Sequence, residues 1–178
     1  MSGKEITNPL LQYYETNIRD LTAKKGIANV DYQQADENYD ASQERYNVAF
    51  REYYNSNYEI EEYQKQIEIL QKQMQEEIAL AGNDENKINE IKTQYTSQIN
   101  LINWNISSLT PGNNNNRFSL SEARNYRSEC FSNKNGTEFD FLFYNRQLGD
   151  AYYAYGNAKQ QDIVFNAIQN KKSGSIFS

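Results

Sequence analysis

The chain contains no histidine and a single cysteine among its 178 residues. Histidine is the commonest general base and the commonest metal ligand in proteins, so its absence excludes the catalytic triads and metal sites that depend on it. Cys130 alone can form neither an internal disulfide bond nor a cysteine cage for a metal ion. No glycine-rich phosphate-binding loop occurs either. The sequence therefore predicts a protein that is not an enzyme and that carries no cofactor and no metal ion.

Long apolar runs and an excess of basic residues are also missing. No stretch approaches the ~18 consecutive apolar residues of a membrane-spanning helix. The first residues, Met1–Glu5, lack the apolar core of a secretion signal. The net charge of −6 disfavours a nucleic-acid-binding protein, because such proteins usually carry a basic face. We expect a protein of the cytoplasm or of a virion, without a recognisable secretion signal.

Aromatic residues, by contrast, are abundant, with 15 Tyr and 8 Phe. Only 38% of the residues are hydrophobic and the mean hydropathy is −0.95, values that a disordered chain could also have. Disordered chains are poor in aromatic residues, however, so the tyrosines and phenylalanines indicate a folded protein. A thin helical protein with a large surface fits both observations.

A seven-residue repeat runs through Leu11–Ala81, and its first and fourth positions, together called the seam, are mostly apolar or small. The first positions are Leu11, Ile18, Lys25, Tyr32, Tyr39, Tyr46, Tyr53, Ile60, Ile67, Met74 and Ala81. The fourth positions are Tyr14, Leu21, Ala28, Ala35, Ser42, Ala49, Ser56, Tyr63, Leu70 and Glu77. Such a repeat predicts a long helix in a left-handed coiled coil with another helix.

The predicted first helix covers about residues 9–81, after an N-terminal arm at 1–8. Asn8 can cap this helix and Pro9 suits its first position. The repeat keeps its phase across Gly26, so we favour a continuous helix; two helices that meet at Lys24–Ile27 are the alternative. Gly82 predicts a turn at 82–84, followed by a second helix at about 85–109. Residues 9–110 are therefore expected to form an antiparallel helical hairpin.

The predicted second helix is too short to cover the whole seam. With about 25 residues, it covers the first helix only back to about Asn57. The seam from Ala28 to Ser56, which alternates Tyr with Ala or Ser, then needs another partner. We expect this partner to be the C-terminal helical region of the same chain or of a neighbouring one.

The C-terminal third is predicted to be separated from the hairpin. Pro111, Gly112 and the four asparagines that follow predict an Asn-rich linker at 111–118. Ser119 and Glu122 form a capping box that opens C-terminal helices over 119–171, before a polar tail at 172–178. The expected fold is all-α: a long heptad-repeat helix, an antiparallel helical hairpin and a C-terminal helical region, arranged as an elongated coiled coil or three-helix bundle.

The candidate functional residues are aromatic and basic. We expect partner binding at aromatic residues of the seam, of a second stripe and of the most apolar patch: Tyr32, Tyr39, Tyr46, Phe50, Tyr53, Tyr54, Tyr58, Phe139, Phe141 and Phe143. The second stripe, Phe50–Tyr54–Tyr58, either packs on a third helix of the same chain or docks another protein. A weak basic patch of Arg117, Arg124 and Arg127 is either a solvated helix face or a contact for phosphate or an acidic partner.

These features favour a non-enzymatic structural or assembly protein, a helical strut that packs against other subunits of a large complex. The frequent Asn, Gln, Lys, Ile and Tyr are typical of AT-rich coding sequences and point to a phage, a virus or an AT-rich microbe. A component of a phage or virus particle is the function that we expect. The alternative is a soluble coiled-coil adaptor or chaperone-like protein that binds partners transiently. A third, less favoured hypothesis is a nucleic-acid-associated protein that acts through the three arginines. The expected partners are protein subunits, either copies of the chain or other components, in an oligomer or a larger complex.

Overall fold

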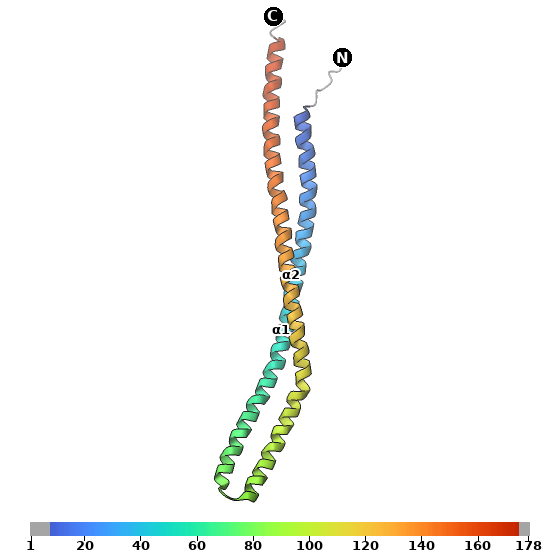
Figure 1. Cartoon of the computed structure of the whole chain (residues 1–178). Helices are drawn as coiled ribbons and strands as arrows, with labels where there is room; N and C mark the ends of the chain where they lie inside the picture. The colour runs from blue at the N-terminus through green and yellow to red at the C-terminus, as the bar shows by residue number, and fades with distance from the viewer. Residues whose placement is uncertain (1–7, 175–178) are drawn as a thin grey trace. The chain divides into compact units, whose positions relative to one another are not determined.

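The fold is all-helical. The computed structural model describes residues 8–174, with side chains over 8–169. This part of the chain contains two helices, α1 (Pro9–Ala81) and α2 (Glu85–Gly174), and no strand (Figure 1). The predicted all-α class is confirmed, whereas the third helix of a three-helix bundle is absent from residues 8–174. The predicted arm (residues 1–7 of it) and the tail residues 175–178 lie outside the described residues.

Helix α1 begins and ends where the sequence predicts. The Asn8 side-chain oxygen accepts a hydrogen bond from the Leu10 amide at 3.0 Å, as expected of a capping residue. The helix continues through Gly26, so the alternative of two helices that meet at 24–27 is wrong. It ends before Gly82, whose φ of 61° is the left-handed conformation typical of a glycine that follows a helix. Asp84 then caps α2 by accepting from the Lys87 amide at 3.1 Å.

Helix α2 differs from the prediction because it has no break. The Asn-rich linker predicted at 111–118 is helical, and the predicted separate C-terminal helices are parts of the same 90-residue helix, which also includes residues 172–174 of the expected tail. Pro111 lies inside the helix and removes one backbone donor. Packing against α1 accounts for this outcome, since most of the stability of a helix in a protein comes from tertiary contacts rather than from propensity.

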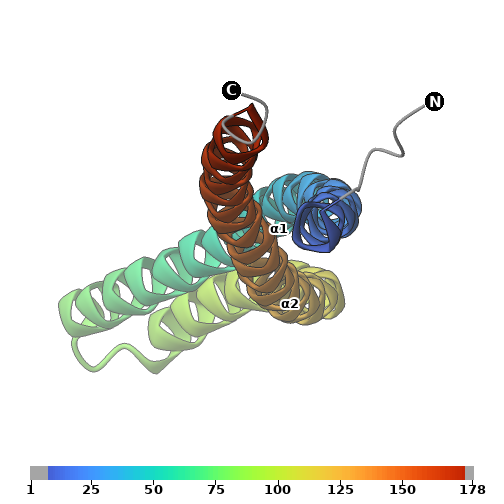
Figure 2. The same ribbon diagram turned by 90° about the horizontal axis from the view of Figure 1, so that it is seen from above.

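The chain divides into two compact units. Unit 1 comprises residues 1–39 and 130–178, and unit 2 comprises residues 40–129. In unit 2 the two helices run side by side to the turn (Figure 2). In unit 1 the first part of α1 pairs with the last part of α2. Asn8 donates there to Asp162 at 2.7 Å, and the Tyr155 hydroxyl donates to Glu15 at 2.8 Å. These pairs define an antiparallel arrangement.

The predicted seam is the buried face of α1. Every first and fourth position from Leu11 to Met74 is buried or partly buried. The most deeply buried members are small: Ala28, Ala35, Ser42 and Ala49. Opposite Ala49 lie Leu120 and Ala123, which form a core cluster with it. The prediction that the C-terminal region packs on the Tyr/Ala part of the seam is confirmed, and the partner is the same chain.

The second helix predicted at about 85–109 would cover the first helix only back to about Asn57. This limit does not apply, because α2 continues without a break to Gly174. The Ser56 hydroxyl in unit 2 meets Asn113 at 2.8 Å, inside the stretch that was expected to be a linker. Within residues 8–174, neither helix includes a segment apolar enough to cross a membrane.

Candidate partner-binding surface

Phe50, Tyr54 and Tyr58, here called the aromatic ladder, remain exposed on α1. Their exposed fractions are 44%, 62% and 55%. The ladder continues from the seam residue Tyr46, with ring centroids 6.1 Å apart between Tyr46 and Phe50 and 6.0 Å apart between Phe50 and Tyr54. Each step of four residues turns about 40° around a helix, so the ladder winds away from the seam towards solvent. No third helix covers it within residues 8–174, so the packing on a third helix of the same chain, one of the two interpretations of this stripe, is not found there.

The predicted seam tyrosines have a different role, because their partners lie within the chain. In unit 1, the Tyr32 ring stacks on Phe141 with centroids 6.2 Å apart, and Tyr39 contacts Phe131 at 5.6 Å. In unit 2, Tyr46 and Tyr53 are partly buried against the core cluster of Ala49, Leu120 and Ala123. The structure therefore places these four tyrosines in the seam rather than on a free surface.

The apolar patch around residue 141 is split between the seam and the surface of unit 1. Phe141 is partly buried under Tyr32 and has the Lys25 ammonium 5.9 Å from its ring centroid. Phe139 and Phe143, four residues apart, are 69% and 47% exposed. They form a second apolar patch on the outer side of α2.

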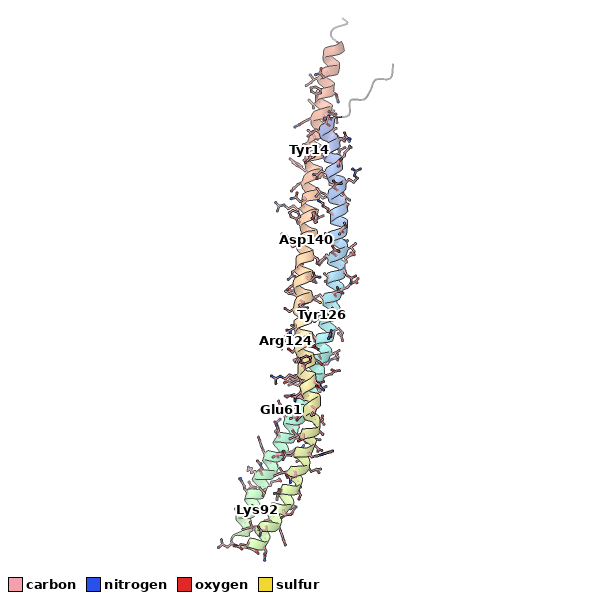
Figure 3. All side chains as sticks on the ribbon, turned by 45° about the vertical axis from the view of Figure 1, so that its right-hand side comes forward. Tyr14, Glu61, Lys92, Arg124, Tyr126 and Asp140 are labelled. Carbon is pink, nitrogen blue, oxygen red and sulfur yellow. The ribbon has the colours of Figure 1, made fainter. Side chains whose placement is uncertain are left out.

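The three arginines of the predicted basic patch are also in different environments. Arg127 is partly buried: its guanidinium lies 4.1 Å from the Tyr46 ring centroid, and it donates to Gln43 at 3.4 Å. Arg117 and Arg124 are exposed, and neither forms an ion pair with any side chain of residues 8–169 (Figure 3, Arg124 labelled). Arg127 thus stabilises the helix pair, whereas Arg117 and Arg124 are free to contact a partner.

The helix pair of unit 2 has two different flanks on either side of its seam. On one flank, the Arg45 guanidinium lies 5.5 Å from the Tyr126 ring centroid, and a groove is lined by residues of both helices that include Val48, Glu52 and Glu122. This carboxylate flank consists of Ala41, Arg45, Val48, Glu52, Asn55, Glu59 and Glu62 of α1 with Asn115, Ser119, Glu122, Tyr126 and Glu129 of α2.

Residues on the other side of each seam form the second flank. Here Gln43 of α1 accepts from Arg127 of α2, and Phe50 begins the aromatic ladder. This arginine flank consists of Gln43, Asn47, Phe50, Tyr54, Asn57 and Glu61 of α1 with Asn114, Arg117, Ser121, Arg124 and Ser128 of α2. Phe50 and Tyr54 of the ladder and the two exposed arginines, which the sequence presents as separate features, thus share one side of the helix pair.

A polar layer crosses the seam of unit 2, and the sequence analysis missed it. The Ser56 hydroxyl donates to Asn113 Oδ1 at 2.8 Å and accepts from Asn116 Nδ2 at 3.3 Å. Asn116 Nδ2 also lies 3.4 Å from the Glu52 carbonyl oxygen. One signal could have revealed it: Leu109, Asn116 and Ala123 follow one another at steps of seven, in phase with the second helix. A polar pair at such a position is known to fix the register of paired helices.

Two tyrosines join the helices through carboxylates. The Tyr95 hydroxyl donates to Glu77 at 2.8 Å in unit 2, as Tyr155 does to Glu15 in unit 1. In both cases the hydrogen bond to the carboxylate raises the pKa of the tyrosine, with desolvation as the second cause. These phenols stay protonated and bridge the helices at neutral pH.

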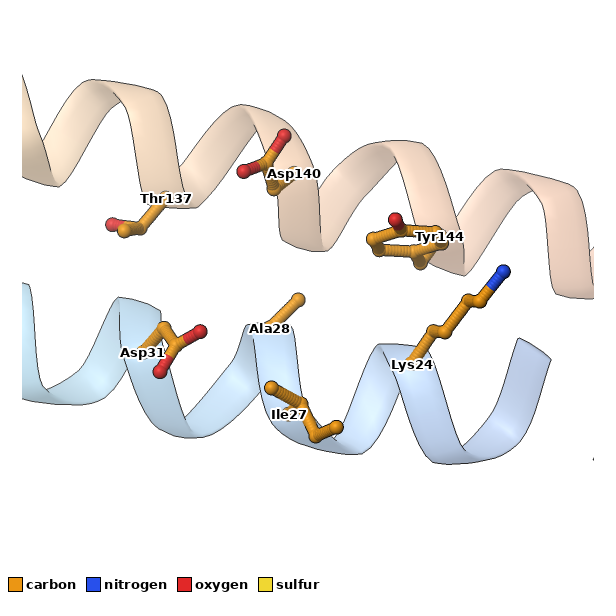
Figure 4. Close-up of a pocket in the computed structure, with 7 residues that line it drawn as sticks. All are labelled: Lys24, Ile27, Ala28, Asp31, Thr137, Asp140 and Tyr144. Carbon is orange, nitrogen blue, oxygen red and sulfur yellow. The ribbon is translucent and has the colours of Figure 1, made fainter. Parts of the chain in front are cut away.

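The depression in Figure 4 carries no chemistry of its own. It is lined by Lys24, Ile27, Ala28, Asp31, Thr137, Asp140 and Tyr144 of unit 1. The small side chain of the buried Ala28 leaves this space between the helices. The Thr137 hydroxyl already donates to backbone carbonyls of α2, and residues 8–169 contain no cluster of three His, Cys, Asp or Glu that could hold a metal ion.

Comparisons with protein-family models, with curated proteins and with solved structures found no match to this chain.

Proposed function

We propose that the chain is a non-enzymatic structural subunit whose two helices form an antiparallel coiled coil and whose aromatic ladder packs against other subunits of a large complex. One observation carries this proposal. The chain supplies a partner for its own seam in each unit, yet Phe50, Tyr54 and Tyr58 stay exposed. Exposed aromatic residues that are grouped on one face are typical of protein–protein interfaces.

The aromatic ladder is also preorganised for binding. Complete burial of one such side chain is worth about 1.5–3 kcal/mol. The Phe50 ring already stacks on its neighbours in the ladder and seam, so little rotamer freedom remains to be lost when a partner covers it. Binding costs are lower for groups that are ordered beforehand. The ladder therefore suits a permanent contact between subunits.

The continuous α2 supports a strut in preference to an adaptor. Transient adaptors often depend on a flexible linker, and the stretch 111–118 expected to provide one is helical. The more specific proposal, a component of a phage or virus particle, is supported by the composition typical of AT-rich coding sequences.

The test is size fractionation of gentle extracts from the cells or particles in which the chain occurs. Wild type is expected at a mass far above its own 20.8 kDa. A ladder variant, Phe50→Ser with Tyr54→Ser and Tyr58→Ser, should move to the mass of the free chain. The matched control replaces Tyr13, Tyr152 and Tyr153, three exposed tyrosines of unit 1, by Ser and should not move. Wild type and ladder variant both found as free chains would contradict the proposal.

A further inference from the structure

The two flanks of unit 2 carry opposite charge. The arginine flank holds Arg117 and Arg124 against one carboxylate, Glu61, which accepts from Asn57 at 2.6 Å, and its other residues are Phe, Tyr, Gln, Asn and Ser. The carboxylate flank holds Glu52, Glu59, Glu62, Glu122 and Glu129 against one cation of its own, Arg45, which lies over the Tyr126 ring. Glu62 also pairs with Lys65, outside the flank, at 2.8 Å. A protein whose charges are evenly mixed would not have this segregation, and its net charge of −6 does not reveal it.

The spacing of these charges also matches. Arg117 and Arg124 are seven residues apart on α2, which places them about 10 Å apart along one side of the helix. Glu122 and Glu129 have the same separation on α2, as do Glu52 and Glu59 on α1. Two arginines can therefore meet two carboxylates without any change in either helix.

The apolar residues of the two flanks complement each other as well. Phe50 projects from the arginine flank with 44% of its surface exposed. The groove on the carboxylate flank contains apolar atoms of Ala41, Val48 and Ala49 between Glu52 and Glu122. An aromatic ring that enters an apolar groove between carboxylates, beside its own arginines, combines an apolar anchor with a charged rim, as specific interfaces do.

We propose that the arginine flank of one copy of the chain packs against the carboxylate flank of a second copy. This inference rests on the proposed function and names the subunit that the ladder contacts. Arg117 and Arg124 pair with carboxylates of the second copy, while Phe50 enters its groove. A symmetric contact between two arginine flanks would bring four guanidinium groups together, and like charges at an interface are costly.

The two contact surfaces are different, so the contact is heterologous. Each copy that uses its arginine flank keeps a free carboxylate flank for the next copy, and such contacts build rings or open filaments rather than closed dimers. The assembly therefore grows with protein concentration. Its exposed ion pairs weaken when salt shortens the Debye length from about 10 Å at 0.1 M to about 3 Å at 1 M.

The experiment is sedimentation velocity on the purified full chain and three variants. One variant carries Arg117→Glu and Arg124→Glu, and the second carries Glu52→Arg and Glu122→Arg. The first has two negative flanks, and the second has cations on both sides of the groove, beside Arg45, so that they meet the arginines of the other copy. Each variant should therefore remain at 20.8 kDa, while an equal mixture of the two should assemble again. The matched control, Arg19→Glu with Arg146→Glu, changes the net charge as the first variant does, but at exposed residues of unit 1, and should assemble like wild type.

The outcomes separate this inference from the proposed function. A wild-type chain that is monomeric at every concentration would overturn the self-contact, while the mass in native extracts would still decide the proposed function. Assembly that both double variants retain, or a mixture that fails to assemble, would also overturn the pairing of the two flanks. Far-ultraviolet circular dichroism of each variant excludes misfolding as the cause.

Discussion

Replacement of Pro111 and Gly112 by Ala should stabilise the chain, because both residues lie inside α2. Proline in a helix interior is about 3 kcal/mol less favourable than alanine. Removal of the proline also raises the conformational entropy of the unfolded chain, which reduces the gain in stability by about 1 kcal/mol. The net gain from Pro111→Ala is then about 2 kcal/mol. Gly112→Ala adds about 1 kcal/mol, and no atom within 4 Å would obstruct the added methyl group.

The double variant should therefore gain about 3 kcal/mol in free energy of unfolding, which corresponds to a Tm higher by about 6–12 °C in a chain of this size. Chemical and thermal unfolding followed by circular dichroism at 222 nm, a standard helix wavelength, measure both quantities. In a loop the same changes would be neutral or would cost up to about 1 kcal/mol. An unchanged or lower Tm would thus refute the continuous helix. Gly82→Ala is the control, since its φ of 61° makes a destabilisation of about 1 kcal/mol the expected result.

Three further predictions follow from contacts between the helices. Arg127→Met should lower the free energy of unfolding by about 0.5–2 kcal/mol in denaturant titrations, because the cation lies over a seam tyrosine; Arg124→Met, which removes no such contact, should change it by less than about 0.5 kcal/mol. Because its carboxylate partner raises the pKa of Tyr95, that hydrogen bond stabilises the chain below the ordinary tyrosine pKa and is lost as pH rises through the raised value. The stability difference between wild type and Tyr95→Phe, measured against pH, should accordingly shrink in alkali, and a constant difference would count against the bond. Replacement of Asn113 and Asn116 by Leu should raise the unfolding midpoint but loosen the register of the helices, which amide exchange or cross-linking would detect as more than one pairing.

The sequence was sufficient for α1 because one pattern and two local rules agreed there. The first and fourth heptad positions from Leu11 to Met74 form the buried face of α1. Asn8 caps the start of the helix and Gly82 follows its last residue, as the chemistry of each residue predicts. At Gly26 the unbroken phase of the repeat correctly outweighed a poor helix former.

The same argument from phase would have predicted α2. Ile88, Tyr95, Ile102 and Leu109 lie at steps of seven, and the series continues through Asn116, Ala123, Cys130, Thr137, Tyr144, Ala151 and Ala158. Local composition around Pro111 favoured a linker instead, and tertiary packing overrides such local preferences. The error shortened the second helix, so that the partner of the Tyr/Ala seam was sought in the C-terminal region of the same or of a neighbouring chain, and the tyrosines of the seam were assigned to partner binding.

The candidate surface depends on three-dimensional pairing, which the linear sequence does not contain. That Phe50, Tyr54 and Tyr58 form a second stripe was evident from their spacing. The register of α2 on α1 is needed to see that Arg117 and Arg124 lie on the same flank as Phe50. It is also needed to see that Arg127 contacts Tyr46 and Gln43 of α1. Segregation of charge between two flanks can be recognised only after that register is known.

The most direct test of the self-contact is a zero-length cross-link between copies. Arg117→Lys and Arg124→Lys keep the charge of the arginine flank and introduce amines that a carbodiimide couples to adjacent carboxylates. Equal amounts of this variant with ¹⁴N and with ¹⁵N are mixed, so mass spectrometry distinguishes links between copies from links within one. Mixed-isotope peptides that join position 117 or 124 to Glu52, Glu59, Glu122 or Glu129 are the predicted result. Cross-links confined to single-isotope peptides, or mixed-isotope links that avoid these glutamates, would contradict the account.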